Sequence, residues 1–325
     1  MSPVGRMVSY GMATAPRKKV SRATFTLKPA IPFRLDLTVW VLRRVSINEI
    51  DRWDGRTYRR VFVLGDTPVA TEVTQTGPPA APRLKVTATA PRLTLRKLEQ
   101  LRDLLENALG LNVKLAPFYD LASRHEALAQ LAAPFLGFRP PRLPSMFETL
   151  VNGIACQQVS LVAGLYLLNR LSSTYGLSAG QSHAFPRPRD LAGANPQQLR
   201  LIGFSMRKGQ YILDLSRAVA SGELDLESLS ALDDAAAIER LQQLSGVGRW
   251  TAEYALLRGL GRLDVFPADD IGAQNKLQEW LGLKSRPDYA RVNRVLQPFR
   301  PYRGLIYFHM LMSQQQRKGL YNPPA

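Results

Sequence analysis

Cysteine and histidine are scarce in this chain of 325 residues, which holds one cysteine and three histidines. The single thiol, Cys156, excludes an internal disulfide, a zinc ribbon built on cysteine pairs and an iron–sulfur cluster held by four cysteines. The histidines, at positions 125, 183 and 309, are scattered along the chain. A structural zinc site is therefore not expected.

Long hydrophobic runs are also missing. No uninterrupted apolar stretch reaches the roughly 20 residues that a membrane-spanning helix needs, and the first residues lack the apolar segment of a secretory signal. With 45% hydrophobic residues the sequence can still bury substantial cores, and its length suggests about two or three domains. We therefore expect a cytoplasmic globular protein that does not contact a membrane.

Negative charge is in short supply. The chain has 43 Lys and Arg residues against 26 Asp and Glu, a formal net charge of +17. Residues 1–60 hold 13 of the basic residues and 4 of the acidic ones. This excess predicts a polyanionic partner. Ribosomal and RNA-binding proteins share such a balance, and a gain in solubility is the alternative explanation.

The periodicity of apolar residues divides the chain into three parts. Residues 1–22, with basic residues at 17–19, show no periodicity and are interpreted as a flexible basic arm. Residues 23–115 combine β-type segments with one amphipathic helix and predict a small α+β domain. Residues 116–325 are helical in pattern almost throughout and predict an all-α region.

Individual elements can be predicted inside both regions. In the α+β domain, segments 35–39, 58–64 and 83–87 have β-type patterns, and 94–109 shows a helical stripe opened by a threonine cap. In the helical region, the apolar spacing predicts helices over 145–156, 159–175, 196–202, 206–221, 234–244, 249–261, 270–281, 288–297 and 302–314.

The sharpest local signal is the segment 244–252, which reads Leu-Ser-Gly-Val-Gly-Arg-Trp-Thr-Ala and lies between two helical stripes. Two glycines one residue apart allow a tight turn with positive φ and a close backbone approach. The free N–H groups that start the next helix would then face outward, where they and the helix dipole attract a phosphate. Simple turn chemistry between helices is the alternative.

Two adjacent carboxylates, Asp269 and Asp270, follow a short way downstream, after an apolar stretch and Pro267. Asp270 stands where the N-cap of the next helix is expected, and capped amides favour an ionised carboxylate. Its use would be to stabilise the positive charge that develops on a sugar as a glycosidic bond breaks. The alternative is that Asp270 only caps the helix.

Taken together, these segments resemble the helix-hairpin-helix superfamily of DNA glycosylases, and within it the alkylpurine (3-methyladenine type II) DNA glycosylases. The resemblance extends over about residues 23 to 315 and follows the family's order. The segments that carry it are Phe147-Glu148, Ile154 to Ser160, Gly203-Phe204-Ser205 with Arg207-Lys208, Leu244 to Ala252, Phe266 to Asp270, and Pro298 to Arg303.

The resemblance implies a fold and an activity. The fold is an α+β N-terminal domain, similar to half of a TATA-binding-protein fold, followed by an all-α helix-hairpin-helix glycosylase domain. The activity is the excision of alkylated purines from duplex DNA by base flipping, in base excision repair. The implied protein is a nucleoid-associated monomer that acts on damaged double-stranded DNA.

The resemblance also implies roles for single residues. Asp270 would be the catalytic carboxylate and Asp269 its accessory neighbour. Trp250 and Tyr254, four residues apart and so on one helical face, would stack on the extruded base. Tyr302 matches a further aromatic position of the pocket.

The implied DNA contacts centre on the hairpin. They comprise Leu244, Gly246, Val247, Gly248 and Thr251 of the hairpin segment, Gln158 in the position of the wedge that fills the gap in the duplex, and Lys208. The carbonyl oxygens of Leu244 and Val247 would hold a monovalent cation, Na⁺ or K⁺, and no other cofactor is expected.

One position bears on the mechanism. Members of the superfamily that also nick the strand carry a lysine two residues after the second hairpin glycine, where it forms a Schiff base. This chain has Trp250 there. Members that act on adenine mismatches or damaged pyrimidines, and that resemble endonuclease, usually carry a C-terminal cluster held by four cysteines. A chain with one cysteine cannot supply it. The resemblance therefore implies a monofunctional alkylpurine enzyme.

The sequence departs from the family pattern in two places. Leu311 stands where close relatives carry a tryptophan, and Gln158 is polar where the wedge is apolar. Two alternatives stay open at this point: a glycosylase for oxidised purines that has no lyase activity, and a non-catalytic DNA-binding module that keeps the hairpin.

Overall fold

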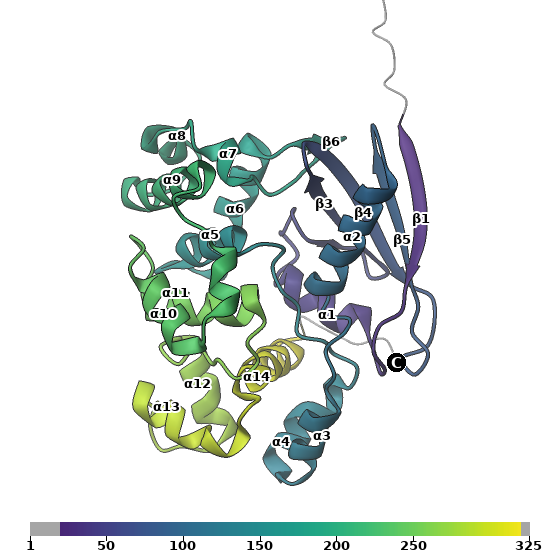
Figure 1. Ribbon diagram of the computed structural model, residues 1–325. Helices are drawn as coiled ribbons and strands as arrows, with labels where there is room; N and C mark the ends of the chain where they lie inside the picture. The colour runs from purple at the N-terminus through teal and green to yellow at the C-terminus, as the bar shows by residue number, and fades with distance from the viewer. Residues whose placement is uncertain (1–19, 320–325) are drawn as a thin grey trace, which may run out of the picture.

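A computed structural model describes residues 20–319 of the chain. An antiparallel sheet comes first and a larger helical part follows (Figure 1). The first part consists of β1 Ser21–Leu27, α1 Leu35–Arg43, β2 Arg52–Trp53, β3 Thr57–Leu64, β4 Thr67–Gln75, β5 Leu84–Ala90 and α2 Leu95–Ala108.

The second part is almost entirely helical. It consists of α3 Ala116–Ser123, α4 Glu126–Ala132, η1 Ala133–Phe135, α5 Met146–Cys156, α6 Leu161–Tyr175, β6 Ser178–Ala179, β7 Ser182–His183, α7 Pro188–Leu191, α8 Pro196–Leu201, α9 Met206–Ser221, η2 Glu227–Ala231, α10 Asp234–Gln242, α11 Arg249–Ala255, η3 Leu256–Leu260, α12 Ile271–Trp280, α13 Tyr289–Val295, η4 Gln297–Phe299 and α14 Arg303–Arg317. All nine helices predicted in this part are confirmed, with ends that differ by a few residues.

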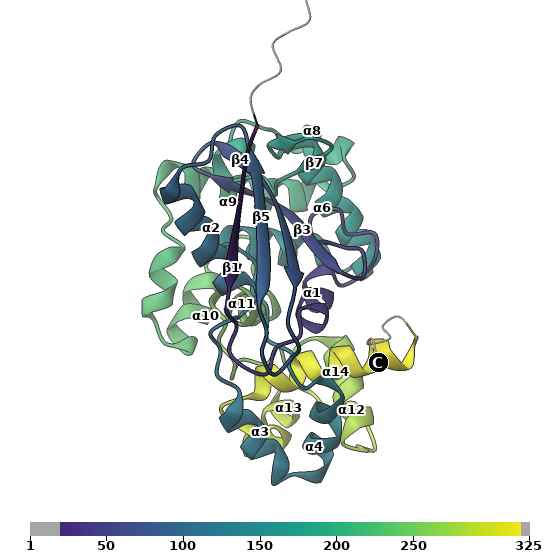
Figure 2. The same ribbon diagram turned by 90° about the vertical axis from the view of Figure 1, so that its right-hand side faces the viewer.

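The sheet has five strands in the order β1-β5-β4-β3-β2, and every neighbouring pair is antiparallel. Figure 2 views the molecule from the side of this sheet, with the helices behind it. The boundary predicted for the basic arm, residue 22, is wrong, because Ser21 and Arg22 belong to β1 and pair with Ala90 and Thr89 of β5. Residues 1–19 lie outside the described part.

The strand predicted over residues 35–39 is wrong, because this segment starts helix α1. The helix is buried on two sides at once. Leu35, Val39 and Leu42 pack with the sheet, whereas Leu37, Trp40 and Val41 pack with helices. Two interleaved helical stripes produce a nearly continuous apolar run, in which an alternation typical of a strand arises by chance.

The helical part has two separate cores. One is built by α5 to α11, with Ile154, Leu168 and Leu241 among its fully buried residues. The other joins α3, α4 and α12 to α14 to one side of α1, around Phe118 and Phe308. The second core therefore brings together three segments that are far apart in the sequence, namely α1, α3 with α4, and α12 to α14. These segments meet where the two cores adjoin. Among residues 20–319, none of the helices combines the length and apolar character needed to cross a membrane.

Candidate active site

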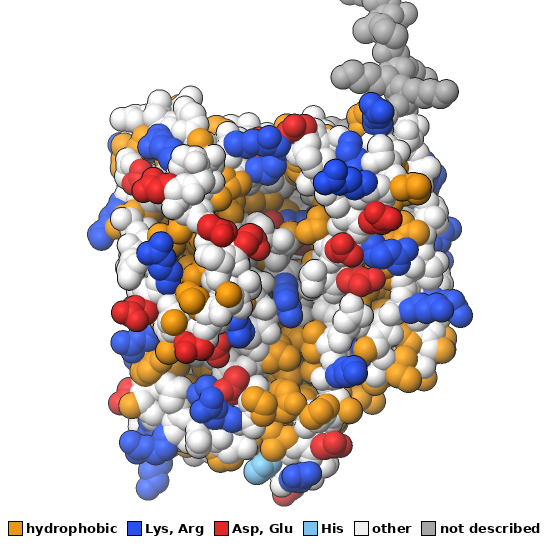
Figure 3. All heavy atoms as spheres, in the orientation of Figure 1, with side chains coloured by type: hydrophobic (Ala, Val, Ile, Leu, Met, Phe, Trp, Pro, Cys, Tyr) orange, Lys and Arg blue, Asp and Glu red, His pale blue; other side chains and the backbone are white. Residues whose placement is uncertain are grey.

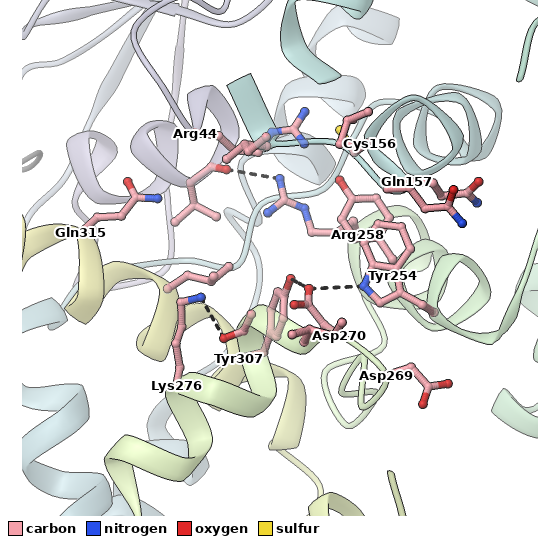
Figure 4. A pocket seen from close by; sticks show the side chains of 18 of the residues that line it. Arg44, Cys156, Gln157, Tyr254, Arg258, Asp269, Asp270, Lys276, Tyr307 and Gln315 are labelled. Atoms are coloured by element: carbon pink, nitrogen blue, oxygen red, sulfur yellow. Dashed lines mark hydrogen bonds between the residues drawn. The ribbon is translucent and has the colours of Figure 1, made fainter. Parts of the chain in front are cut away.

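Asp270 is the N-cap of α12, as predicted. Its Oδ1 accepts a hydrogen bond from the Ala273 amide at 2.9 Å. Two side chains converge on its other oxygen. Trp250 Nε1 donates to Oδ2 at 3.3 Å and Tyr307 OH donates at 3.0 Å (Figure 4). Because all three partners are donors, they complement a negatively charged carboxylate and hold it in one orientation.

The carboxylate faces a cavity of about 670 Å³. Its walls come from α1, from the α5–α6 turn, from α11 and η3, and from α12 and α14, so it lies where the two helical cores adjoin. A volume of this size suits a group as large as a nucleobase with part of its sugar. In Figure 3, hydrophobic side chains gather at the lower centre of one face, and basic side chains are spread over the rest among acidic ones.

Trp250 and Tyr254 form an aromatic wall of the cavity. Their ring centroids are 5.5 Å apart and the ring planes differ by 22°, so the two side chains stack on one another. The predicted pair on one face of α11 is therefore confirmed in its geometry. Leu311, noted for replacing a tryptophan, also lines the cavity.

Tyr302 does not belong to the cavity, which corrects the prediction for this residue. It precedes α14 and packs edge-on against Phe118 in the core, with 5.8 Å between the ring centroids. The aromatic residue of α14 that reaches the cavity is Tyr307, which is 6% exposed and binds Asp270. Burial raises the pKa of Tyr307 well above its usual value, so its hydroxyl stays a donor. The sequence offered both tyrosines and no signal that separates them.

The hairpin lies between α10 and α11. Gly246 has φ +81°, and a Cβ atom there would meet the ring of Tyr211 at 2.2 Å, so this position requires glycine. Gly248 begins α11 as its N-cap and has open space on its Cα. Leu244 and Val247 turn their side chains into the helical core. What the hairpin presents outward is thus its backbone around Gly248.

Two residues predicted to contact DNA are occupied by protein groups. The Thr251 hydroxyl is buried and accepts a hydrogen bond from Gln157 Nε2 at 2.9 Å. The Lys208 ammonium donates to the carbonyl oxygens of Ala155 and Gln157 at 3.0 and 2.6 Å. Through these bonds both side chains brace the end of α5. The DNA contacts expected of Thr251 and Lys208 stay a prediction.

Gln158 lies in the turn between α5 and α6 and is exposed at the rim of the cavity. Its neighbour Gln157, which sequence reasoning missed, also donates to the Gly246 carbonyl at 2.8 Å and so ties this turn to the hairpin. Gln158 has φ +53°, and Arg44, the other non-glycine residue with positive φ between residues 20 and 319, lines the same cavity with φ +65°. Unfavourable backbone conformations of this kind gather at functional sites.

Asp269 differs from its neighbour. Its carboxylate extends away from Asp270 in Figure 4 and lies 3.9 Å from the guanidinium of Arg249. The Asp269 side chain is 40% exposed. It lines the mouth of the cavity but does not share the hydrogen bonds that fix Asp270.

Glu253, a further residue that sequence reasoning missed, holds the loop before Asp270 from behind. It is 3% exposed, and its carboxylate accepts hydrogen bonds from the Ala268 amide at 3.0 Å and from Tyr289 OH at 2.9 Å. Burial raises the pKa of Glu253 to about 7. Its place three residues after Trp250 gives no hint of this role, because the loop that it supports folds back from a distant part of the chain.

Comparisons with known proteins found similarities in sequence and in fold. The family model described as HhH-GPD superfamily base excision DNA repair protein matches residues 151–301. A DNA-3-methyladenine glycosylase of Bacillus subtilis is 28% identical over 218 residues, which cover 66% of this chain and 72% of the relative. In fold, the chain resembles a 3-methyladenine DNA glycosylase from Archaeoglobus fulgidus, with a TM-score of 0.78, 24% identity, and coverage of 90% of this chain and 98% of that chain.

A third similarity is to a solved complex. The 3-methyladenine DNA glycosylase of Schizosaccharomyces pombe in complex with abasic DNA is 27% identical to this chain, with a TM-score of 0.54. The match covers 63% of this chain and 98% of that chain.

Proposed function

We propose that this chain, whose residues 151–301 match the model of the HhH-GPD superfamily of base excision DNA repair proteins, is a monofunctional DNA glycosylase that excises alkylated purines from duplex DNA. The observation that carries the proposal is the fixed carboxylate of Asp270 beside the stacked rings of Trp250 and Tyr254. One end of the cavity thus offers a negative charge and the wall beside it offers a stacking surface.

The proposed chemistry needs little from the protein beyond this arrangement. Alkylation makes a purine cationic, so the bond between the sugar C1′ and the base nitrogen breaks with its electron pair moving to the base. The sugar then carries oxocarbenium charge, which a fixed anion stabilises better than bulk water does. A water molecule adds its oxygen to C1′ and releases a proton, leaving an intact strand with an abasic site. Trp250 occupies the position of the strand-nicking lysine, so that position supplies no amine to compete with water. The Lys276 amine, which also lines the cavity, donates to the Gly272 carbonyl at 3.0 Å.

The proposed DNA contact is the hairpin with the adjacent turn. The open backbone around Gly248 would receive a phosphate, and Gln158 would enter the space that the extruded base leaves. Val159 and Leu161, which are 42% and 36% exposed beside Gln158, add apolar surface there. DNA binding is supported by the resemblance to a glycosylase solved with abasic DNA.

Finer parts of the proposal concern the surroundings of the site. We propose that a Na⁺ or K⁺ ion binds the carbonyl oxygens of Leu244 and Val247. The Leu244 oxygen accepts a hydrogen bond from the Val247 amide at 3.1 Å and keeps a second lone pair for such an ion.

We also propose that the sheet with α1 and α2 is the half-TATA-binding-protein-like domain, and that the protein acts as a nucleoid-associated cytoplasmic monomer.

The test is base release. The full chain is incubated with methylated duplex DNA and, separately, with duplexes that carry hypoxanthine or oxidised guanine, and the free bases are quantified. We expect methylated purines to be released fastest, because their positive charge makes them good leaving groups. Preferential release of oxidised guanine would favour the alternative glycosylase, and release of no base would leave a DNA-binding module.

A further inference from the structure

Two arginines line the inner end of the cavity. Arg258 belongs to the π-helical turn η3 and is 3% exposed. Turns of this kind re-aim side chains and are frequent at functional sites. Arg44 follows α1 in the positive-φ conformation described above. Figure 4 shows both guanidinium groups on the side of Tyr254 away from Asp269, above the level of Asp270.

Three donors at this end of the cavity have no acceptor within residues 20–319. The hydroxyl of Tyr254 and the Nε atoms of Arg258 and Arg44 are all buried and have no hydrogen-bond partner among the described residues. Arg258 has one long contact, from its guanidinium to the Val41 carbonyl at 3.4 Å. Arg44 donates to Asn152 Oδ1 at 2.5 Å. A buried donor without a partner carries a desolvation cost, and the three residues that hold these donors all line the cavity.

Arg60, a buried arginine outside this cavity, provides a comparison. It is also 3% exposed, but it pairs with Asp51 at 2.8 Å and with Glu148 at 2.6 Å. Within residues 20–319, Arg258 and Arg44 have no carboxylate within ion-pair distance. Arg139, which is 1% exposed and outside the cavity, also lacks an ion pair within residues 20–319. What distinguishes Arg258 and Arg44 is therefore that their uncompensated charges line the cavity.

The chemistry of these groups selects one kind of partner. A guanidinium carries only donors, and the Tyr254 hydroxyl has a donor to spare. A purine stacked on the aromatic wall, with its sugar at Asp270, has its six-membered ring farthest from the sugar. That edge carries a carbonyl oxygen at C6 in guanine and hypoxanthine, and an amino group, itself a donor, in adenine.

We propose that Arg258, assisted by Arg44 and Tyr254, is a specificity-determining residue that donates hydrogen bonds to the C6 oxygen of the extruded purine. The enzyme then prefers 6-oxopurines over 6-aminopurines among bases with the same alkylation. This inference rests on the proposed function and narrows its substrate class. The positive charge of the two arginines strengthens each hydrogen bond to the oxygen. Their repulsion of a cationic base acts on both classes of purine alike, so the group at C6 decides the preference.

The experiment compares two lesions with equal charge. Duplexes carry either 7-methylguanine or 7-methyladenine at one site, and each single-turnover rate is divided by the rate of spontaneous loss. The variants are Arg258→Met, which keeps the length of the stem, and Tyr254→Phe, which keeps the ring. The matched control is Arg262→Met, since Arg262 lies outside the cavity and contacts the carbonyls of Ser230 and Leu232. Thermal unfolding of each variant is recorded.

We expect Arg258→Met to lower excision of 7-methylguanine by about 10-fold to 100-fold, the range for a hydrogen bond to a charged group, and to change excision of 7-methyladenine by less than about threefold. Tyr254→Phe should shift the ratio in the same direction by a smaller factor, and Arg262→Met should leave it unchanged. Equal losses on both lesions, or no loss on either, would overturn the inference.

A binding measurement separates this inference from the proposed function. Equilibrium binding of duplexes with hypoxanthine or adenine opposite thymine is measured for Asp270→Asn and for the double variant Asp270→Asn/Arg258→Met. A preference for hypoxanthine that disappears in the double variant supports the assignment of Arg258 even if the parent excises nothing, which would refute the proposed function alone. An unchanged preference refutes the assignment even if the parent excises both lesions.

Discussion

The two ends of the cavity differ in how far the protein satisfies their polar groups. At the Asp270 end, both carboxylate oxygens accept hydrogen bonds, from the Ala273 amide and from Trp250 and Tyr307. At the inner end, Tyr254 OH and Arg258 Nε are buried with no partner in the described part of the chain. The polar groups of the first end are satisfied by the protein itself, whereas the second end keeps buried donors that no described residue satisfies.

This difference between the two ends assigns catalysis to the Asp270 end and recognition of the base to the inner end. A group that stabilises developing charge works best when its surroundings are already fixed, since nothing then has to reorganise during the reaction. A group that reads a substrate discriminates best when the wrong substrate leaves it unpaired. Asp270 has the first property and Arg258 has the second, so substitutions at the two ends should affect different measurements.

The largest effect on the rate of excision is expected at the Asp270 end of the cavity. Asp270→Asn keeps the size and a capping oxygen but removes the charge, so we expect single-turnover excision to fall by at least about 10²-fold, the scale for removing a preorganised electrostatic group. Binding of lesion DNA should be retained or tightened. Asp269→Asn, which alters a half-exposed carboxylate, should cost less. A near-parental rate for Asp270→Asn at equal thermal stability would reduce Asp270 to a helix cap.

A matched pair of tyrosine variants sharpens the comparison. Tyr307→Phe removes one donor to Asp270 Oδ2 and should slow excision of every lesion by a similar factor of about ten. Tyr254→Phe removes a hydroxyl without a partner, so the free energy of unfolding should stay equal or rise. Urea unfolding and single-turnover rates measure both effects. If Tyr307→Phe were selective between lesions, the division of roles would fail.

Glu253 adds a pH dependence behind the Asp270 loop. Burial raises its pKa to about 7, above the value near 4.5 expected in the unfolded chain. The folded state therefore favours the neutral acid, and the resulting stability is complete below about pH 4.5 and lost as the pH rises through about 7. We expect this group to contribute about 1 to 3 kcal/mol over that interval.

The measurement is urea unfolding of the parent and of Glu253→Gln between pH 4.5 and 8. Glutamine keeps an acceptor for the Ala268 amide but does not titrate, so the difference in unfolding free energy between the two proteins isolates Glu253. The parent should lose stability relative to the variant as the pH rises. A difference that is constant with pH would mean that Glu253 is ionised in the folded protein throughout.

The smallest effect on the rate of excision is expected at the rim of the cavity, away from both of its ends. Gln158→Ala should slow excision from stable base pairs by a few-fold and excision from mismatched pairs less, because unstacking a loose base costs less. The exposed neighbours Val159 and Leu161 would retain part of the wedge surface. Rates on matched and mismatched duplexes provide the test, and equal losses on both would remove Gln158 from the wedge.

Much of the Asp270 end could be predicted from the sequence, because its signals are local. The cap at Asp270, the glycines of the hairpin and the four-residue spacing of Trp250 and Tyr254 all act within one or two turns of chain. Tyr307 could not be told apart from Tyr302, since the side chain that reaches Asp270 depends on how α14 packs against α12. Helix α1 could not be distinguished from a strand, because burial on two sides removes the single apolar stripe that marks a helix.

The inner end could not be predicted for a different reason. Arg258 lies in a helical pattern that looks continuous in the sequence, and its direction depends on the π-helical turn η3. Arg44 and Arg60 both belong to the basic excess of the first 60 residues, which we interpreted as attraction to a polyanion. The structure divides them, one at the cavity and one in a buried ion-pair network. Charge counting cannot make that distinction.

The central claim is that a carboxylate and water, not an amine, break the glycosidic bond. The most direct measurement is a single-turnover reaction of the full chain on a duplex with one 7-methylguanine, divided between three treatments: none, alkali, and borohydride. We predict free base in all three, a strand break only after alkali, and no covalent protein–DNA adduct with borohydride. A strand break without alkali, or a trapped adduct in good yield, would contradict the claim.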